Sequence, residues 1–297
     1  MSDAHQTTAN IDTTESTEEQ ADDKTGPTPV TDGSSSIVRA LENAGVEHAF
    51  GVQGGAIMPV YDALWDSDIY HITMAHEQGA SHAADAYGVV AGSPGIALAT
   101  SGPGATNLVT GIADANMDSD AMVALTGQVP SDIVGSDGFQ ETDTTGVTMP
   151  ITKHNYFANS ADTIGDTVGE AFALAESGRP GPTLVDLPKD VSFEETDVEP
   201  GEPTVPKNSE PPTTADPENV EAAARAIERA EKPLLLLGGG VIKANACETA
   251  RAFARDHGIP VVTTMPGIGS FPEDDELCLS WAGMHGTGYA NMAITHT

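Results

Sequence analysis

The strongest constraint on the fold is an alternation, from residue 34 onward, of short apolar runs with stretches of helical apolar spacing. Residues 95–100 and 121–126 are apolar runs that predict buried strands, whereas residues 77–90 and 162–176 predict helices. Such alternation is typical of βαβ units around a parallel sheet, so we predict an α/β fold. The other expected strands are 69–74, 182–187, 233–237 and 259–263, and the other expected helices are 35–42, 56–64, 105–116, 217–230 and 245–257.

Composition divides the chain into four parts. Residues 1–33 are polar and acidic, and we expect a disordered tail because they cannot bury enough apolar surface to order themselves. Residues 34–193 hold the first α/β unit, and residues 194–217, rich in Pro, Glu and Thr, are expected to form an extended linker. Residues 218–297 carry only two clear strands, so we expect an incomplete Rossmann-like domain that buries little.

Charge narrows the classes of partner. The chain has 45 acidic and 12 basic residues, a net charge of −33, which argues against nucleic acid and against an anionic membrane surface. A surplus of carboxylates beyond the tail predicts adaptation to a salt-rich cytoplasm, the alternative being a generic acidic protein with an acidic tail. Two cysteines, no apolar run near 18 residues and no leader pattern predict a cytoplasmic protein that neither spans a membrane nor is exported.

Four segments stand after predicted strands, where ligands usually lie in open α/β sheets. They are FGVQGG at 50–55, HEQGA at 76–80, TSGPGATN at 100–107 and GFQET at 138–142. Each alone has an ordinary interpretation: a packing turn, an acid at a helix start, a tight turn and a loop. No His, Cys and Asp residues have metal-site spacing, so we expect no metal ligand in this chain.

Together and in this order, these segments resemble the acetolactate (acetohydroxyacid) synthase large subunits of the thiamine-diphosphate enzymes. The resemblance runs from about Ser35 to the last residue and includes LTGQVP at 125–130, ITKHNY at 151–156 and SGRPGPTLVDLPKD at 177–190. It implies a pyrimidine-binding domain at 34–193 and part of an FAD-binding middle domain at 218–297. It also implies a transferase that condenses pyruvate-derived hydroxyethyl-thiamine diphosphate with a second 2-oxo acid in valine, leucine and isoleucine biosynthesis.

The resemblance assigns roles residue by residue. Glu77 is implied to hydrogen-bond N1′ of the aminopyrimidine and to favour the imino tautomer that takes the C2 proton. Lys189 matches a lysine at the substrate channel, where a cation suits anionic 2-oxo acids. The residues implied to contact thiamine diphosphate are Gln53, Gly54, Thr100, Pro103, Asn107, Phe139 and Gln140. Those implied to contact FAD are Gly238, Gly239, Gly240, Thr264, Met284, His285 and Gly286.

Three departures from the family pattern leave alternatives open. Gln53 stands where the family commonly has Pro. Ser131 and Asp132 stand where acetolactate synthases usually carry basic residues, which keeps another thiamine-diphosphate-dependent 2-oxo-acid decarboxylase or carboligase as an alternative. No Gly-Asp-Gly occurs in the 297 residues, so the ligands of Mg²⁺ and the diphosphate are expected outside this chain.

The last departure sets the expected partners. We expect a homodimer, or a complex with a chain that carries the diphosphate-binding domain, and a regulatory small subunit is a further candidate partner. We also expect the isolated chain to form no acetolactate. A non-catalytic truncated fragment is the remaining alternative.

Overall fold

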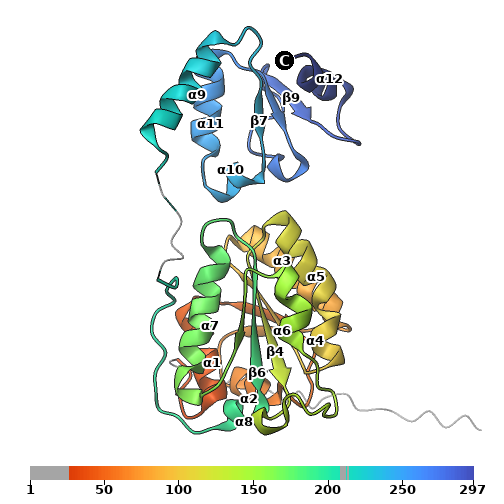
Figure 1. Ribbon diagram of the computed structural model, residues 1–297, viewed down its shortest axis with the longest axis vertical. Coiled ribbons are helices and arrows are strands. Elements are labelled where there is room, and N and C mark those ends of the chain that lie inside the picture. The colour runs from red at the N-terminus through yellow and green to blue at the C-terminus, as the bar shows by residue number, and fades with distance from the viewer. Residues whose placement is uncertain (1–26, 208–211, 213) are drawn as a thin grey trace, which may run out of the picture.

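Two α/β units make up the chain in the computed structural model, which describes residues 27–207, 212 and 214–297 (Figure 1). The predicted fold class is confirmed. Residues 1–26 of the expected tail lie outside the described residues. Within the described ranges, no helix combines the length and the apolar character needed to cross a membrane.

Within residues 27–207, the first unit is a six-stranded parallel sheet with the order β2-β1-β3-β4-β6-β5. Its strands are β1 (His48–Gly51), β2 (Tyr70–Thr73), β3 (Gly95–Ala99), β4 (Met122–Gln128), β5 (His154–Phe157) and β6 (Pro182–Pro188). Every residue of β3, β4 and β6 is buried, as expected for parallel strands that are covered on both faces.

Helices cover both faces of this sheet (Figure 1). They are α1 (Gly33–Asn43), α2 (Met58–Trp65), α3 (Glu77–Ala91), α4 (Pro103–Asn107), α5 (Val109–Asp118), α6 (Thr144–Thr148), α7 (Ala161–Glu176) and α8 (Lys189–Phe193). Ile96 and Leu98 join a core with α1, α2 and α7, whereas Ala97 and Ala99 join a core with α3 and α5. The period of two along β3 thus builds two cores from one strand.

The second unit is smaller. Within residues 214–297, β7 (Leu235–Leu237), β8 (Val261–Thr263) and β9 (Cys278–Trp281) form a parallel sheet in that order. Its helices are α9 (Pro217–Arg229), α10 (Gly239–Lys243), α11 (Cys247–His257) and α12 (Gly288–His296). The core contains Leu237, Ala254, Val261 and Phe271, far fewer side chains than either core of the first unit.

Several elements differ from the sequence prediction, which did not include helices α6, α8, α10 and α12. Strand β5 was not predicted, because His154–Phe157 has a weak apolar pattern and lies at the sheet edge beside β6. Strand β9 was missed because it is short and its pairing with β8 is interrupted by a register shift. The helix expected at 105–116 is divided into α4 and α5 at Leu108.

Helix α1 begins earlier than its apolar spacing suggested. Asp32 is the N-cap: its carboxylate accepts a hydrogen bond from Ser35 N at 2.8 Å, and Asp32 N donates to Ser35 Oγ at 3.0 Å. This reciprocal capping box satisfies two backbone donors at the helix start. Thr28 is also held, since its Oγ1 donates to Glu42 at 2.7 Å. Residues 28–32 are therefore packed on the first unit.

The first residues of the expected linker also lie against the first unit. Thr196 N donates to Thr31 O at 3.2 Å, Asn43 Nδ2 donates to Pro200 O at 3.1 Å, and Gly201 N donates to Asp166 Oδ1 at 2.8 Å. Residues 194–201 thus run as a strap along α1 and α7.

Candidate functional site

The predicted site residues of the first unit share one topological position. Each follows the carboxyl end of a parallel strand, and these ends lie at one edge of the sheet. In chain order they are Gln53 and Gly54 after β1, Glu77 after β2, Thr100, Pro103 and Asn107 after β3, Phe139 and Gln140 after β4, and Lys189 after β6. Strand topology alone therefore gathers residues from five segments.

Glu77 is the first residue of α3, where the helix dipole favours a carboxylate. The preceding residue, His76, caps the helix by accepting a hydrogen bond from Gln78 N on its Nδ1 at 3.0 Å. Asn107 Nδ2 donates to Glu77 Oε2 at 2.9 Å, so α4 fixes one carboxylate oxygen. The other oxygen, Oε1, lies 3.5 Å from the point where a Cβ on Gly104 would stand. The carboxylate therefore faces bare glycine backbone.

Thr100 packs between two glycine turns. A Cβ on Gly54 would lie 2.5 Å from Thr100 Cβ, and one on Gly104 would lie 2.8 Å from Thr100 Cγ2. Thr100 Oγ1 also accepts a hydrogen bond from Ala56 N at 3.2 Å. Both turns need glycine here, because a side chain at either position would displace the threonine. Gln53 is exposed beside this contact, and its Nε2 donates to Thr73 Oγ1 at 3.3 Å.

A third segment joins the same edge. Gly102, at φ +60°, would place a Cβ 2.5 Å from Gln140 O, so the turn of residues 138–142 packs directly on the backbone that precedes Pro103. Gln140 itself has φ 59°, in the left-handed region. The Phe139 ring is 89% exposed. This turn thus presents an aromatic side chain outward next to the Glu77 region.

Glu141 shapes the 138–142 turn from inside. Its carboxylate accepts hydrogen bonds from Gly135 N and, at 2.7 Å, from Gly138 N. These backbone hydrogen bonds hold the pKa of Glu141 below its ordinary value. The turn is therefore closed by a charged group rather than by burial.

Lys189 lies at the same sheet edge as Glu77, but among the described residues the two side chains share no contact. Its ammonium is 5.9 Å from the Phe193 ring centroid. The next residue, Asp190, accepts hydrogen bonds from Ser131 N at 2.9 Å and Ser131 Oγ at 2.5 Å. Burial raises the pKa of Asp190, but the hydrogen bonds from Ser131 and from the backbone of Asp190 and Val191 together hold that pKa below its usual range. Ser131 thus ties the segment after β4 to α8.

The residues predicted to contact FAD follow the strands of the second unit. Gly238, Gly239 and Gly240 follow β7, Thr264 follows β8, and Met284, His285 and Gly286 follow β9. A Cβ on Gly238 would lie 3.7 Å from Thr264 Oγ1, and one on Gly286 would lie 2.6 Å from Ala282 C. The side chain of Met284 is exposed. These segments therefore share one edge of the smaller sheet.

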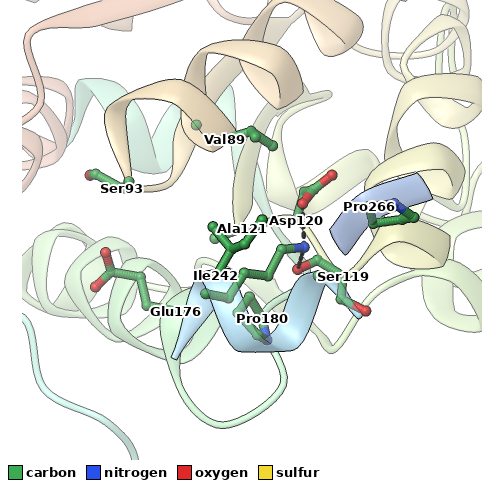
Figure 2. A pocket seen from close by; sticks show the side chains of 13 residues that line it. Val89, Ser93, Ser119, Asp120, Ala121, Glu176, Pro180, Ile242 and Pro266 are labelled. Carbon is green, nitrogen blue, oxygen red and sulfur yellow. Dashed lines mark hydrogen bonds and ion pairs between the residues drawn. The ribbon is translucent and has the colours of Figure 1, made fainter. Parts of the chain in front are cut away.

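The two units meet at a cavity of about 390 Å³ (Figure 2). Ser119 and Pro180 line it from the first unit, at the amino edge of the sheet, and Gly239 and Pro266 line it from the second. Gly239, Gly240 and Thr264 also line a neighbouring cavity of about 520 Å³. Within one chain, the turns predicted to contact FAD therefore face the amino edge of the first sheet, whereas Glu77 lies at its carboxyl edge.

Lys243 joins the units at this cavity. Its Nζ donates to Asp118 O at 2.6 Å and to Ser119 O at 2.7 Å, and it forms an ion pair with Asp120 Oδ1 at 2.5 Å. The two carbonyls belong to the carboxyl-terminal end of α5, where a cation is favoured by the helix dipole. Nothing in the local sequence around Lys243 indicated this contact.

One group of side chains that could hold a metal ion comes together in the fold, although its members have no metal-site spacing in the sequence. His82, Asp85 and Asp114 place ligand atoms within 4.8 Å of one another, because α3 and α5 pack side by side. Burial, followed by the carboxylates of Asp120, Asp114 and Asp118, raises the pKa of Asp85 to about 7. Lys243 supplies positive charge to this group through Asp120. We therefore interpret it as an acidic cluster compensated from the second unit.

Sequence reasoning also missed a buried polar group below the 138–142 turn. Asp186 lies in β6 and is bonded to Thr126 and Gln128 of β4. The available signal was an aspartate inside the apolar run 182–187, where a charged residue needs partners.

Comparison with known proteins places both units in one family. The family model described as thiamine pyrophosphate enzyme, N-terminal TPP binding domain, matches residues 31–147, and the model of the central domain matches residues 220–297. An acetolactate synthase large subunit of Corynebacterium glutamicum is 52% identical over 257 residues, 86% of this chain and 41% of the relative. A probable acetolactate synthase large subunit of Methanocaldococcus jannaschii is 49% identical over 267 residues, 89% of this chain and 45% of the relative. The chain thus spans less than half the length of these relatives.

Proposed function

The chain belongs to the thiamine pyrophosphate enzymes, of which it carries the amino-terminal and central domains, and from this premise we propose that it works as part of an acetolactate synthase. The proposed reaction joins pyruvate to a second 2-oxo acid with loss of CO₂, in branched-chain amino-acid biosynthesis. Relatives with that name, about half identical over most of this chain, support the assignment. The observation that carries it is the Glu77 carboxylate, oriented by Asn107 beside bare glycine backbone.

Thiamine diphosphate fits the residues around Glu77. When bound, this cofactor supplies a centre that stabilises a carbanion. Glu77 Oε1 would hold a proton at a ring nitrogen, while Asn107 keeps Oε2 in place. Gly54 and Gly104 would let the turns that carry them close on Thr100 beside the ring, since a Cβ at either position would meet that side chain. Phe139 and Gln140 would approach the reacting end.

FAD and Mg²⁺ are proposed as further cofactors. For FAD, the support is the gathering of Gly238–Gly240, Thr264 and the 284–286 loop at the carboxyl edge of a parallel sheet, where dinucleotides bind in such folds. For Mg²⁺ and the diphosphate, we propose ligands outside these 297 residues, on a diphosphate-binding domain. The free Cys247 and Cys278 agree with a reducing cytoplasm.

A second candidate is another thiamine-dependent 2-oxo-acid carboligase or decarboxylase. It is favoured by Ser131, which binds Asp190 at a position where the resemblance leads us to expect a basic residue. A substrate carboxylate at this point would meet a hydroxyl group and an acid instead of a cation.

A chimera tests the proposal. This chain replaces the matching portion of the Corynebacterium glutamicum acetolactate synthase large subunit, and products from pyruvate are identified with thiamine diphosphate, FAD and Mg²⁺ present. Acetolactate that disappears in the Glu77→Gln chimera would support the proposal. An aldehyde or another adduct would favour the second candidate, and a folded chimera without any product would contradict both.

A further inference from the structure

A buried carboxylate lies beneath the 138–142 turn. Asp186 is 2% exposed, in a strand whose other residues are all buried. It accepts hydrogen bonds from Thr126 Oγ1 at 2.7 Å and from Gln128 Nε2 at 2.9 Å, both on the neighbouring strand β4. These two donors bind different oxygens of the carboxylate.

Gln128 links the Asp186 carboxylate to the 138–142 turn. Its Nε2 also donates to Thr142 O at 2.9 Å, and its Oε1 accepts from Val129 N at 2.8 Å. A flipped amide would point its oxygen at two acceptors, Asp186 and Thr142 O, so a single orientation is possible. The side chain of Gln128 is thus fixed by the acid on one side and reaches the turn on the other.

The turn depends on this link for its position. Glu141 closes the turn on itself through Gly135 and Gly138, which defines its shape but not its place on the sheet. Among the hydrogen bonds of the described residues, the one from Gln128 to Thr142 O joins residues 134–142 to the sheet. Gln140 O also packs on Gly102.

Burying the Asp186 carboxylate in β6 is unfavourable for the stability of the fold. A buried carboxylate loses hydration, and its hydrogen bonds must offset that cost. Burial accordingly raises the pKa of Asp186 to about 6, although the Thr126 and Gln128 hydrogen bonds oppose the shift. A charge retained at such a position is better explained by what it holds than by stability.

We propose that Asp186 is a positioning residue that, through Gln128, places the 138–142 turn so that Phe139 and Gln140 face the bound cofactor. The assignment builds on the proposed function, since it takes the Glu77 edge as the cofactor site. Asp186 itself touches no reacting group: it acts on Gln128, and Gln128 acts on the turn.

Amide hydrogen exchange in the 297-residue chain tests the mechanical part without any activity. In Gln128→Met, the amide of Thr144, which donates to the same Thr142 O at 2.8 Å, should exchange about tenfold faster or more, because the turn loses its link to the sheet. Thr126→Val is the matched control, since it removes a hydrogen bond to Asp186 without touching the turn. Unchanged exchange in Gln128→Met, or an equal increase in Thr126→Val, would overturn the proposal.

A second pair of variants covers the case in which Gln128→Met does not fold. Asp186→Asn keeps an acceptor for Gln128 and should leave exchange in the turn near wild type. Asp186→Leu removes every acceptor and should accelerate exchange in the turn. Identical exchange in the two folded variants would refute a positioning role for the acid.

The chimera gives the kinetic readout. Gln128→Met should lower kcat about tenfold or more through misplacement of the turn, whereas Thr126→Val should remain within about twofold of the parent. An inactive parent chimera would reject the proposed function and leave the exchange result valid. An active chimera whose kcat is unchanged in Gln128→Met would reject the positioning role alone.

Discussion

The two units use the same architecture but differ in how firmly they support their ligand edge. In the first, the sheet is covered on both faces and its central strands are wholly buried. In the second, the core is small, and α9 has no buried residue, with Val220 and Ile227 on its exposed surface. Parallel topology is sufficient to gather glycine turns at an edge, whereas fixing them requires a core beneath. The first unit has both.

The largest effect should come from Glu77. In the chimera, Glu77→Gln should reduce turnover by about 10²–10⁴-fold, because the amide cannot share a proton with the ring nitrogen. Glu77→Asp should be intermediate. The free energy of unfolding should change by less than about 1 kcal/mol, the value of one acid at a helix start. Hydrogen–deuterium exchange at C2 of the bound cofactor measures the step.

The control for Glu77 is Met284→Ala, at the corresponding edge of the second unit. Its side chain is exposed, and we expect less than about tenfold loss of turnover. Equal losses in both variants would remove the contrast between the two edges.

The next largest effect should be a difference between the two units in how their stability depends on salt. The chain carries a net charge of −33, and its repulsion is screened over about 3 Å in 1 M salt but over far longer distances at millimolar concentrations. Transfer to low KCl should therefore unfold the second unit first, because its core is smaller. Amide exchange should rise in β7, β8 and β9 before it rises in β3 and β4. Simultaneous loss of protection in both sheets would show that the units are not independent.

The buried acid of the first unit should give a smaller, pH-dependent effect. Asp186→Asn should raise the free energy of unfolding at pH 7 by about 1–3 kcal/mol. The pKa of Asp186 is raised by burial to about 6, with Thr126 and Gln128 opposing and the Asp143 carboxylate adding to the shift.

The sign follows from the raised pKa. The carboxyl group favours the folded state most below its ordinary pKa of 3.8 and loses that contribution as the pH rises through 6. Asparagine has no such loss, so its advantage should grow between pH 4 and pH 7. Urea unfolding at both pH values measures it, and an advantage of equal size at pH 4 would contradict the titration of Asp186.

The smallest effect should come from the junction. Lys243→Met should change the stability of either unit by less than about 1 kcal/mol, because partly exposed ion pairs contribute little. The amides at the end of α5 and in α10 should nevertheless exchange faster. Lys232→Met, on the exposed surface of the second unit, is the matched control. Equal exchange in both variants would show that Lys243 does not hold the units together.

Sequence alone was informative where local patterns determine structure. The apolar runs of β3, β4 and β6 and the glycine turns behind them are local features, and the structure places them where they were predicted. Strand β5 lacked such a pattern because an edge strand needs little apolar surface. The bond between Asn107 and Glu77 spans 30 residues, and the one between Gln128 and Asp186 spans 58, so spacing could not reveal them. The resemblance named Glu77 and Asn107 as site residues, but it named neither Gln128 nor Asp186.

The strap of residues 194–201 has a further consequence. Gly33 N donates to Glu194 O at 3.0 Å, and Asp32 pairs with Glu195 in an antiparallel bridge, so the two ends of the first unit lie side by side. A short peptide could connect them, and new termini could then be opened in an exposed turn such as that at Gly135. The first unit is therefore suited to circular permutation, which would detach the second unit from its usual point of entry without cutting the sheet.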